Sequence, residues 1–284
     1  MRILVTGSAG KLGKVTVQQL RDSGHVVVGV DLLDSDTTDS ILDVQNFQAV
    51  LAFTKGFDAI IHTAALHGRH MDLNYPRQRF VDTNITGTLN LLNGCVENQI
   101  KRFLFTSTTS IYGSAMVDEN QAVWVTEKLT AQPRDIYDIT KQACEELCRD
   151  FFEKERIMTS VYRVGRFLPE PDNLTLNHRL YRGLDERDGA KGLKLGVEHN
   201  FSSFEIFNLC SGSLFNKEDL IELKVNPLPV IAKYIPEAVD IYKKNNWIFP
   251  SSIDRVYRCD KASEILGYNP KYTFKYLLNK VSVR

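Results

Sequence analysis

The chain has 284 residues, enough to bury a sizeable core as one large domain with a smaller lobe. Hydrophobic residues make up 43% of it and charged residues 25%, a composition typical of globular proteins. Lys plus Arg and Asp plus Glu each number 35, so no excess charge favours nucleic acid or an anionic membrane as a partner. No apolar run approaches the roughly 20 residues of a membrane span. Because Met1 leads directly into a strand-like run, we expect no signal peptide.

The chain contains five cysteines, an odd number, with no C-x-x-C pair. Free thiols in a reducing compartment explain this better than a disulfide framework does, so we expect a cytoplasmic protein. His67 and His70 are three residues apart, but no second pair of ligands accompanies them. Because a structural or catalytic metal needs three or four side-chain ligands, we predict no metal site.

Short apolar runs alternate with longer amphipathic runs in the first half of the chain, the pattern of a parallel sheet covered by helices. Strands are expected at residues 2–6, 26–31, 59–62, 103–106 and 160–163. Helices are expected at 12–23, 44–53, 84–98 and 136–153. Strands this apolar are buried on both faces. We therefore predict an α/β fold with a Rossmann-type, doubly wound parallel sheet, in which ligands bind beyond the carboxyl ends of the strands.

The regular alternation fades after about residue 165, where prolines punctuate shorter elements. We predict a large domain over residues 1–165 and a smaller C-terminal lobe over 166–284 that binds the substrate. The apolar run at 204–209 is typical of a late strand, so we expect residues 204–212 to return to the main sheet.

A glycine-rich turn follows the first expected strand, where Gly7, Gly10 and Gly13 form a G-x-x-G-x-x-G pattern that opens a helix. Glycines let the backbone turn tightly and approach a pyrophosphate, whose negative charge the helix N-terminus favours. Lys11 and Leu12 lie within the turn. A glycine triplet alone is a weak signal, but its place between a strand and a helix predicts a dinucleotide site that includes these five residues.

Asp31 ends the second expected strand, where a carboxylate can accept hydrogen bonds from the adenosine ribose. The same charge repels the extra phosphate of NADP, and the following Leu32 and Leu33 supply no arginine to neutralise it. NAD is therefore the expected cofactor. Lys11 and Lys14 lie near the same site and keep NADP open as the less favoured alternative.

Two further stretches are candidates for the surroundings of the cofactor. Asp43 and Val44 follow an Asp-rich loop and could touch the adenine edge, although a loop aspartate is as often a helix cap. Ala64 and Ala65 follow the third expected strand, where small side chains would let the cofactor approach closely. His62, just before them, is as readily a packed core histidine as a ligand.

Tyr137 and Lys141 lie four residues apart on an expected helix, so they share one face. A free phenol has a pKa near ~10 and is a poor base, but a nearby ammonium stabilises the phenolate and lowers that pKa. A tyrosine tuned in this way can take the proton of a substrate hydroxyl as hydride leaves its carbon. The Y-x-x-x-K pattern is common by chance, and a solvated helix face explains most such matches.

A hydroxyl-rich stretch that contains Thr108 and Thr109 follows the strand expected at 103–106. A hydroxyl at this place lies at the carboxyl end of the strand and can hydrogen-bond the reacting oxygen. A turn without chemistry is the alternative. Together with the glycine turn and the Tyr137–Lys141 pair, the stretch predicts a site for hydride and proton transfer in which both threonines contact substrate.

These three motifs, in this order, resemble the extended short-chain dehydrogenase/reductase superfamily and its NAD-dependent epimerase/dehydratase family. UDP-galactose 4-epimerase belongs to this branch. The likeness covers residues 1–165 and returns at 205–209 and 260–270.

The resemblance assigns roles to single residues. It implies that Tyr137, Lys141 and Thr108 are catalytic and that Tyr137 and Lys141 also contact the cofactor. It places Asn84 beside the cofactor. It further implies a homodimer formed through two helices, those expected at 84–98 and 136–153.

The residues after Thr108 reduce the number of possible reactions when the chain is compared with the subfamilies that it resembles. The 4,6-dehydratases carry an Asp-Glu pair there, and this chain has Thr109 and Ser110. Ser110 also stands where the UDP-glucuronate decarboxylases have a glutamate and the GDP-fucose synthases a cysteine. The resemblance therefore disfavours those reactions and leaves a 4-epimerase or a plain dehydrogenase.

The substrate is expected to be a sugar or a nucleotide-sugar. Residues 163–171 look closer to uronate dehydrogenases, because they lack the Asn of the Arg-x-x-Asn-x-x-Gly-Pro pattern that helps hold nucleotide-sugars. A sugar or uronate dehydrogenase is therefore the alternative. Arg163 and Arg166 are candidates to bind an anionic group of the substrate. A protein that senses NAD(H) without catalysis is the alternative from another class.

Overall fold

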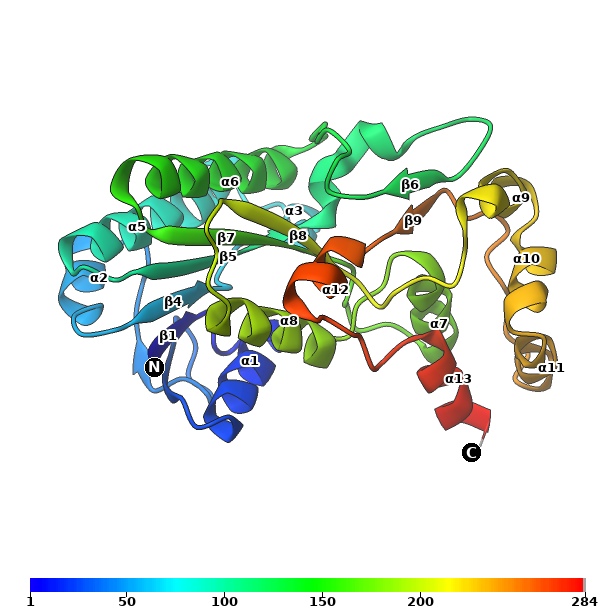
Figure 1. The fold of residues 1–284 in the computed structure, drawn as a ribbon, viewed down its shortest axis with the longest axis horizontal. Coiled ribbons are helices and arrows are strands. Elements are labelled where there is room, and N and C mark those ends of the chain that lie inside the picture. The colour runs from blue at the N-terminus through cyan, green and yellow to red at the C-terminus, as the bar shows by residue number, and fades with distance from the viewer. Residues whose placement is uncertain (283–284) are drawn as a thin grey trace.

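The computed structural model describes residues 1–282 and is built around a seven-stranded sheet (Figure 1). Every pairing within this sheet is parallel. From one edge to the other, the strands are β3 (Ser40–Ile41), β2 (Val26–Asp31), β1 (Arg2–Thr6), β4 (Ala59–His62), β5 (Arg102–Thr108), β7 (Met158–Val164) and β8 (Glu205–Leu209). This arrangement confirms the predicted α/β fold of Rossmann type.

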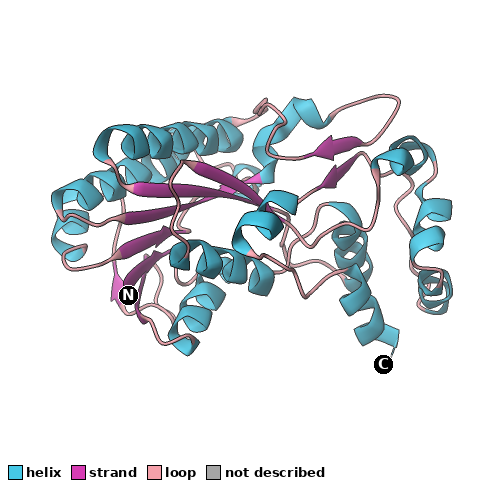
Figure 2. Ribbon diagram, viewed as in Figure 1, coloured by secondary structure: helices cyan, strands magenta, loops and turns pink. Residues whose placement is uncertain are grey.

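Helices cover both faces of this sheet (Figure 2). One face carries α1 (Lys11–Asp22), α8 (Glu186–Glu198) and α12 (Asp260–Leu266). The other face carries α2 (Phe47–Phe53), α5 (Gly87–Glu97) and α6 (Ile136–Glu155). A separate hydrophobic cluster lies on each side. The central strands are therefore buried on both faces, as parallel strands require.

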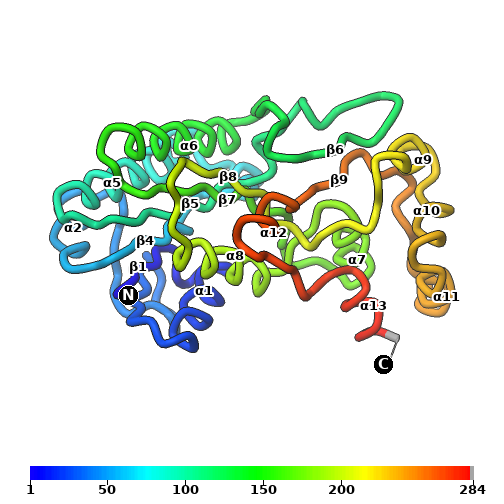
Figure 3. The backbone as a smooth tube through the Cα atoms, viewed as in Figure 1, coloured from blue at the N-terminus to red at the C-terminus, as the bar shows by residue number. Residues whose placement is uncertain are grey.

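A second, smaller lobe packs around its own hydrophobic cluster. It contains a two-stranded parallel sheet of β6 (Val123–Val125) and β9 (Arg255–Tyr257). Its helices are α7 (Asp172–Tyr181), α9 (Leu220–Val225), α10 (Pro227–Tyr234), α11 (Glu237–Lys244) and α13 (Phe274–Ser282). In the trace of the chain, α13 lies beside α7 at one end of this lobe (Figure 3).

The sheet and the lobe are interleaved in the sequence rather than divided at residue 165. β8 lies beside β7 in the main sheet, within the range 204–212 that was expected there. α8 also belongs to the main body, because it packs against α1. Conversely, β6 precedes residue 165 but pairs with β9 in the lobe. A site at the carboxyl edge of the sheet can therefore draw residues from both halves of the chain.

Two helices begin a few residues after the positions that the sequence predicted. α2 begins later than expected because the Asn46 side chain accepts a hydrogen bond from the Ala49 N–H at 3.1 Å and caps the helix. The helix expected at 84–98 is α5, which begins at Gly87 after a π-helical turn at Val81–Thr86. Such turns are wider than α-helical turns and occur often at functional sites.

Short helical segments fill the remaining connections. They are α3 (Arg69–Asp72), α4 (Arg77–Phe80) and two 3₁₀-helical stretches, Thr109–Met116 and Lys217–Asp219. Among residues 1–282, no helix combines the length and the apolarity that crossing a bilayer requires.

Glycines on one side of α8 let this helix approach the sheet closely. A Cβ atom at Gly196 would lie 1.7 Å from the hydroxyl oxygen of Tyr162, and one at Gly192 would lie 2.5 Å from a methyl carbon of Leu209. Tyr162 and Leu209 are fully buried strand residues, so they have no room to withdraw. A larger residue on this side would therefore push α8 away from β7 and β8.

We predict that Gly196→Ala lowers the free energy of unfolding by about 1–3 kcal/mol, because the added methyl group overpacks the interface between α8 and the sheet. Urea denaturation followed by circular dichroism measures the change. Lys194→Ala, on the more exposed side of the same helix, is the control and should cost less than about 0.5 kcal/mol. A Gly196→Ala protein as stable as wild type would contradict the close packing.

Candidate active site

The turn between β1 and α1 leaves no space for a side chain at two of its glycines. Gly7 has a φ of +73°, and a Cβ atom there would lie 2.5 Å from the backbone nitrogen of Ala64. A Cβ atom at Gly13 would lie 2.0 Å from the Gly7 carbonyl oxygen. Gly10 precedes α1 without a side-chain cap, so the N–H groups of the first helical turn can receive an anion. The turn therefore fits the pyrophosphate of a dinucleotide.

Asp31, the last residue of β2, lies against this turn. Its Oδ2 accepts a hydrogen bond from the Ala9 N–H at 3.0 Å, and its Oδ1 accepts one from the Leu33 N–H at 3.1 Å. Each carboxylate oxygen has a further lone pair, so ribose hydroxyls can still bind. The backbone thus holds the carboxylate beside the glycine turn.

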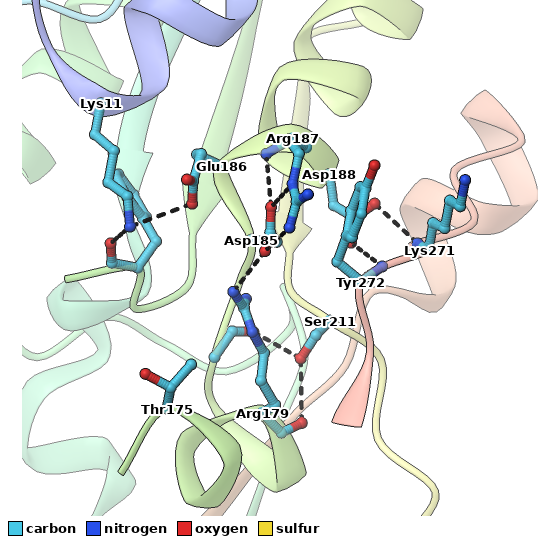
Figure 4. A network of polar contacts seen from close by, with 12 residues as sticks. Lys11, Thr175, Arg179, Asp185, Glu186, Arg187, Asp188, Ser211, Lys271 and Tyr272 are labelled. Carbon is cyan, nitrogen blue, oxygen red and sulfur yellow. Dashed lines mark hydrogen bonds and ion pairs between the residues drawn. The ribbon is translucent and has the colours of Figure 1, made fainter. Parts of the chain in front are cut away.

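Lys11 and Leu12, the first residues of α1, lie in different surroundings. Lys11 Nζ donates a hydrogen bond to the Phe167 carbonyl at 3.0 Å and lies 3.3 Å from the Glu186 carboxylate (Figure 4). Lys11 thus links α1 to the segment after β7 and to the start of α8. The Leu12 side chain is buried in the core, so its part in an anion site is its backbone N–H.

Asp43 and Val44 lie in the connection between β3 and α2. Asp43 is exposed, and its Oδ1 accepts a hydrogen bond from the Gln45 N–H at 2.9 Å. Val44 is buried, and its side chain lies against Gly87 at the start of α5. Asp43 is therefore a turn-forming residue and Val44 a core residue, while their contact with adenine stays a prediction.

The loop after β4 includes Ala64 and Ala65, both partly exposed, and the Ala64 backbone contacts the glycine turn. Asn84, in the π-helical turn, holds this loop in place. Its Oδ1 accepts a hydrogen bond from the Leu66 N–H at 2.8 Å, and its Nδ2 donates to the Leu66 carbonyl at 3.0 Å. Nδ2 also donates to the Thr140 hydroxyl of α6 at 3.0 Å. Asn84 therefore positions the loop next to α6 through an amide that is already bound to protein groups.

His62, at the end of β4, is a core residue. Its two ring nitrogens form hydrogen bonds with the hydroxyls of Thr6 at 2.7 Å and Thr88 at 3.1 Å. Burial, reinforced by the charge of Lys141, lowers the pKa of His62 to about 3, so the ring is neutral at physiological pH. Of the two interpretations that the sequence left open, the structure supports the packed histidine.

Tyr137, in the first turn of α6, meets Thr108 at the end of β5. The Asp135 side chain caps α6 by accepting a hydrogen bond from the Asp138 N–H at 3.0 Å, which fixes where the helix starts. The Tyr137 phenol lies near the Thr108 side chain. Burial raises the pKa of Tyr137, the nearby Thr108 hydroxyl opposes this shift, and the charges of Asp138 and Asp135 add to it.

Lys141 lies one helical turn after Tyr137 and is 3% exposed. Its Nζ donates a hydrogen bond to the Thr106 carbonyl at 2.7 Å and lies 4.6 Å from the centre of the Phe105 ring. Burial lowers the pKa of Lys141 to about 8. The sequence predicted that this ammonium lowers the pKa of the phenol. In the structure the ammonium is bound to a backbone carbonyl and burial of the phenol dominates, so the pKa of Tyr137 lies above its usual value.

Two predicted substrate contacts are buried structural residues instead. Thr109 is buried, and its hydroxyl donates to the Val164 carbonyl at 3.3 Å. Arg163 is 6% exposed, and its guanidinium binds the carboxylate of Glu145 on α6 with a shortest N–O distance of 2.6 Å. Arg163 pairs with Ser107 in the β5–β7 register, and the Ser107 hydroxyl also donates to Glu145. These contacts correct the predicted roles of Thr109 and Arg163, because both side chains are directed into the protein.

Arg166 remains a candidate for substrate binding. Its guanidinium is exposed and lies 2.6 Å from the carboxylate of Glu170, which also binds the His178 ring at 2.6 Å. A cavity of about 180 Å³ opens beside this pair and extends to Lys11. Arg166 therefore lies on a hollow that reaches the start of α1, where the glycine turn lies.

Sequence reasoning missed three residues around the site. Glu145 follows Lys141 by four residues, so a second charge on the same face of α6 was the signal that could have found it. Asp138 is fully buried, and burial raises the pKa of its carboxyl group. A Cβ atom at Gly68 would lie 3.8 Å from the Tyr137 ring, so this loop borders the phenol. Within residues 1–282, no group of three His, Cys, Asp or Glu side chains is placed to hold a metal ion.

We predict that Glu145→Gln destabilises the protein by about 3 kcal/mol, because it leaves the buried Arg163 without a counter-charge. Chemical denaturation measures the loss. Glu146→Gln is the matched control, since Glu146 forms an exposed pair with Arg149 and should contribute less than about 1 kcal/mol. Equal losses in the two variants would contradict the buried ion pair.

The buried ammonium of Lys141 makes the fold less stable at neutral pH. Its pKa falls from 10.5 to about 8 on folding, which corresponds to about 3 kcal/mol. Below pH 8 both the folded and the unfolded chain bind the proton, so the full cost is present. Between pH 8 and 10.5 only the unfolded chain binds it, so the free energy of unfolding rises with pH across this window.

We therefore predict that Lys141→Met stabilises the protein at pH 7 by up to about 3 kcal/mol, although Lys141 is a candidate catalytic residue. The gain should shrink as the pH rises from 8 towards 10.5, where the wild-type lysine becomes neutral. Urea titrations at several pH values measure both effects. Lys154→Met, the same change at an exposed position of the same helix, is the control. A Lys141→Met protein less stable than wild type at pH 7 would contradict this account.

The sequence of the chain is similar to those of several enzymes, two of which are a UDP-glucose 4-epimerase and a uronate dehydrogenase. The UDP-glucose 4-epimerase of Pisum sativum is 31% identical over 175 residues, which cover 54% of this chain and 48% of that protein. The uronate dehydrogenase of Pseudomonas syringae pv. tomato is 26% identical over 178 residues, which cover 61% of this chain and 62% of that one. The match thus spans about half the length of the epimerase.

The fold is similar to those of solved structures. A short-chain dehydrogenase/reductase superfamily protein from Agrobacterium tumefaciens with bound NAD superposes with a TM-score of 0.73 and 21% identity, over 100% of this chain and 96% of that one. Residues 3–170, more than half of the chain, match the family described as the NAD dependent epimerase/dehydratase family. This segment includes the glycine turn, Asp31, Thr108, Tyr137 and Lys141. The chain belongs to the NAD dependent epimerase/dehydratase family of enzymes.

Proposed function

We propose that this protein transfers hydride between NAD and a hydroxyl-bearing carbon of a sugar or nucleotide-sugar, with Tyr137 as the acid or base, in the manner of a 4-epimerase. The observation that supports this most is the packing of α6 against β5 and the stretch that follows it, which brings the Tyr137 phenol near Thr108. Thr108 lies at the carboxyl end of β5, two strands from β1, where the glycine turn begins. A proton-transferring pair thus lies on the same edge of the sheet as the dinucleotide cradle.

NAD, when bound, supplies the nicotinamide ring that takes up and returns hydride. The glycine turn would hold its pyrophosphate and Asp31 its adenosine ribose. The Thr108 hydroxyl would bind the substrate oxygen, and Tyr137 Oη would receive the proton of that hydroxyl. In the reverse direction the protonated phenol, whose pKa burial raises, is the acid that returns the proton.

Oxidation of the substrate needs a phenolate, so the pKa of Tyr137 must fall during the reaction. Lys141 lies one helical turn after Tyr137 on the same helix face, and its Nζ is held by the Thr106 carbonyl. A movement of this ammonium towards the phenol oxygen would stabilise the phenolate and lower its pKa. Tyr137 and Lys141 would then act as a unit that also borders the cofactor.

The surroundings of Thr108 favour hydride and proton transfer over elimination of water. An elimination needs an additional acid and base next to the reacting carbon. The two residues after Thr108 are Thr109, which is buried against the Val164 carbonyl, and Ser110. Neither supplies a carboxylate. An epimerase or a dehydrogenase is therefore proposed in preference to a dehydratase.

A sugar or uronate dehydrogenase is the second candidate. Arg166 is exposed beside the 180 Å³ cavity and already binds one carboxylate, that of Glu170. A guanidinium in this position suits the carboxylate of a sugar acid. The similarity to a uronate dehydrogenase, which extends over 62% of that enzyme, supports the same substrate class. The homodimer through α5 and α6 and the cytoplasmic location stay predictions.

We predict that Tyr137→Phe lowers turnover by about 10²–10⁴-fold, because it removes the proton-transferring oxygen and keeps the ring. The purified protein with NAD is incubated with sugars, uronates and UDP- or dTDP-sugars, while absorbance follows NADH and product analysis follows stereochemistry. Net NADH identifies a dehydrogenase, and an epimer without net NADH identifies an epimerase. Tyr276→Phe, the same change in α13, is the control and should keep full turnover.

Two outcomes would overturn the proposal. Wild-type turnover by Tyr137→Phe would remove Tyr137 from the chemistry. No NADH and no epimer from any substrate, together with tight NAD binding by wild type and Tyr137→Phe alike, would favour the protein that senses NAD(H) without catalysis.

A further inference from the structure

Two of the five free cysteines lie near each other where the lobe meets the main sheet. Cys210 directly follows β8, and Cys259 lies between β9 and α12. The Cys210 thiol donates a hydrogen bond to the Tyr257 carbonyl at 3.5 Å, two residues before Cys259, and the Cys259 thiol lies near it. Both side chains belong to the same hydrophobic cluster. The fold therefore brings together two sulfur atoms from segments far apart in the chain.

Hydrogen bonds hold the backbone around the two cysteines. The hydroxyl of Tyr268, a buried residue, donates to the Cys210 carbonyl at 3.0 Å, and the N–H of Tyr268 donates to the Ala262 carbonyl of α12 at 3.2 Å. The Ser263 N–H donates to the Cys259 carbonyl at 3.0 Å. These bonds tie the end of β8 to the first turns of α12, so the two thiols stay near each other.

The pair gives up its first proton more readily than an isolated buried thiol does. The Cys210 thiol lowers the pKa of Cys259, and burial opposes this shift. The charge of Asp260 also opposes it, while the charge of Arg258 adds to it. A neighbouring S–H group stabilises a thiolate because it can donate a hydrogen bond to it. Cys259 and burial raise the pKa of Cys210. Because the thiolate is the reactive form, Cys259 is the nucleophile of the pair.

The other three cysteines lack this combination of features. Cys95, Cys144 and Cys148 belong to the hydrophobic cluster on the opposite face of the sheet. Burial raises the pKa of each of them. Cys144 and Cys148 are also neighbours, one turn apart on α6, but burial keeps both protonated. Oxidation should therefore select the pair of Cys210 and Cys259.

A cavity of about 250 Å³ adjoins the pair. Its lining includes Cys259 together with Ser211 and Gly212, the two residues that follow Cys210. A water molecule takes up about 30 Å³ in the liquid, so the cavity admits a molecule as small as hydrogen peroxide. A small oxidant can thus reach the surroundings of the two thiols without unfolding of the lobe.

We propose that Cys210 and Cys259 are a redox-active pair, a modification site at which hydrogen peroxide forms a disulfide. The Cys259 thiolate attacks one peroxide oxygen, the O–O bond breaks, and hydroxide leaves, so that Cys259 becomes a sulfenic acid. The Cys210 sulfur then attacks the Cys259 sulfur, and the sulfenic hydroxyl leaves as water with the Cys210 proton. The first hydroxide takes up the proton that Cys259 lost. One peroxide is reduced to two waters, and a small thiol reverses the oxidation.

The disulfide joins the end of β8 to the start of α12 and encloses α9, α10, α11 and β9 in a covalent loop. A cross-link between distant residues restricts the unfolded chain, so the oxidised protein should resist urea better than the reduced protein. The pair shares no residue with the glycine turn, Thr108 or Tyr137. The modification therefore goes beyond the proposed function, and its test needs neither NAD nor a substrate.

Treatment of the reduced protein with one equivalent of hydrogen peroxide tests the pair. A chromogenic thiol reagent counts the free thiols in denaturant, and mass spectrometry of unreduced tryptic peptides locates the cross-link. We expect the five thiols to fall to three, a peptide with Cys210 joined to one with Cys259, and recovery of all five after reduction. The midpoint of urea denaturation should rise on oxidation and return on reduction.

Variants separate the two roles. Cys210→Ala retains the nucleophile without the second thiol, so Cys259 should stop at the sulfenic acid, which dimedone labels. Cys259→Ala removes the nucleophile and should keep all its remaining thiols without a label. Cys95→Ala is the matched control, because it makes the same change at a buried cysteine of α5 and should form the cross-link as wild type does.

Five thiols after peroxide treatment of the wild type would overturn the proposal. A cross-link that leaves out Cys210 or Cys259 would also overturn it. The same holds if Cys259→Ala loses two thiols as wild type does while circular dichroism shows it folded. If an alanine variant does not fold, the peptide map of the wild type decides.

Discussion

The turn between β1 and α1 is the constraint on which the rest of the site depends. Its glycines admit no side chain, because Cβ atoms at Gly7 and Gly13 would overlap with backbone atoms of neighbouring residues. This contact brings the loop after β4 against the turn and fixes the N-terminus of α1 beside Asp31. The cradle and the carboxyl ends of β4 and β5 consequently form one continuous edge. Under the proposed function, a dinucleotide bound in the cradle would extend along that edge towards Tyr137 and Thr108.

Helix α6 carries the candidate catalytic residues Tyr137 and Lys141 at a cost in stability. Lys141 and Glu145 lie on the same face and are both buried, although burial disfavours either charge. Each is held by a specific partner, Lys141 by the Thr106 carbonyl and Glu145 by Arg163 and Ser107. The Glu145 pair is part of the packing between α6 and the sheet. The Lys141 ammonium is held instead by a neutral carbonyl, so under the proposed function it could move towards the phenol one turn away.

The sequence predicted the structural features that depend on neighbouring residues. It did not predict those that depend on contacts between distant segments. Apolar runs and the glycine turn were enough for the first strands and the cradle, because these depend on neighbouring residues. The side-chain directions at the strand ends were not predictable, so Thr109 and Arg163 were assigned to substrate although the β5–β7 register turns Arg163 towards Glu145. The pairing of β6 with β9 joins segments far apart in the chain, and no local pattern signals it.

A crystal structure of the protein with NAD tests the central claim most directly. The account predicts the pyrophosphate over Gly7–Gly13, the adenosine ribose on the Asp31 carboxylate, and the nicotinamide ring next to the Tyr137 phenol and the Thr108 hydroxyl. Density for the nicotinamide away from Tyr137, or for the pyrophosphate away from the glycine turn, would contradict it.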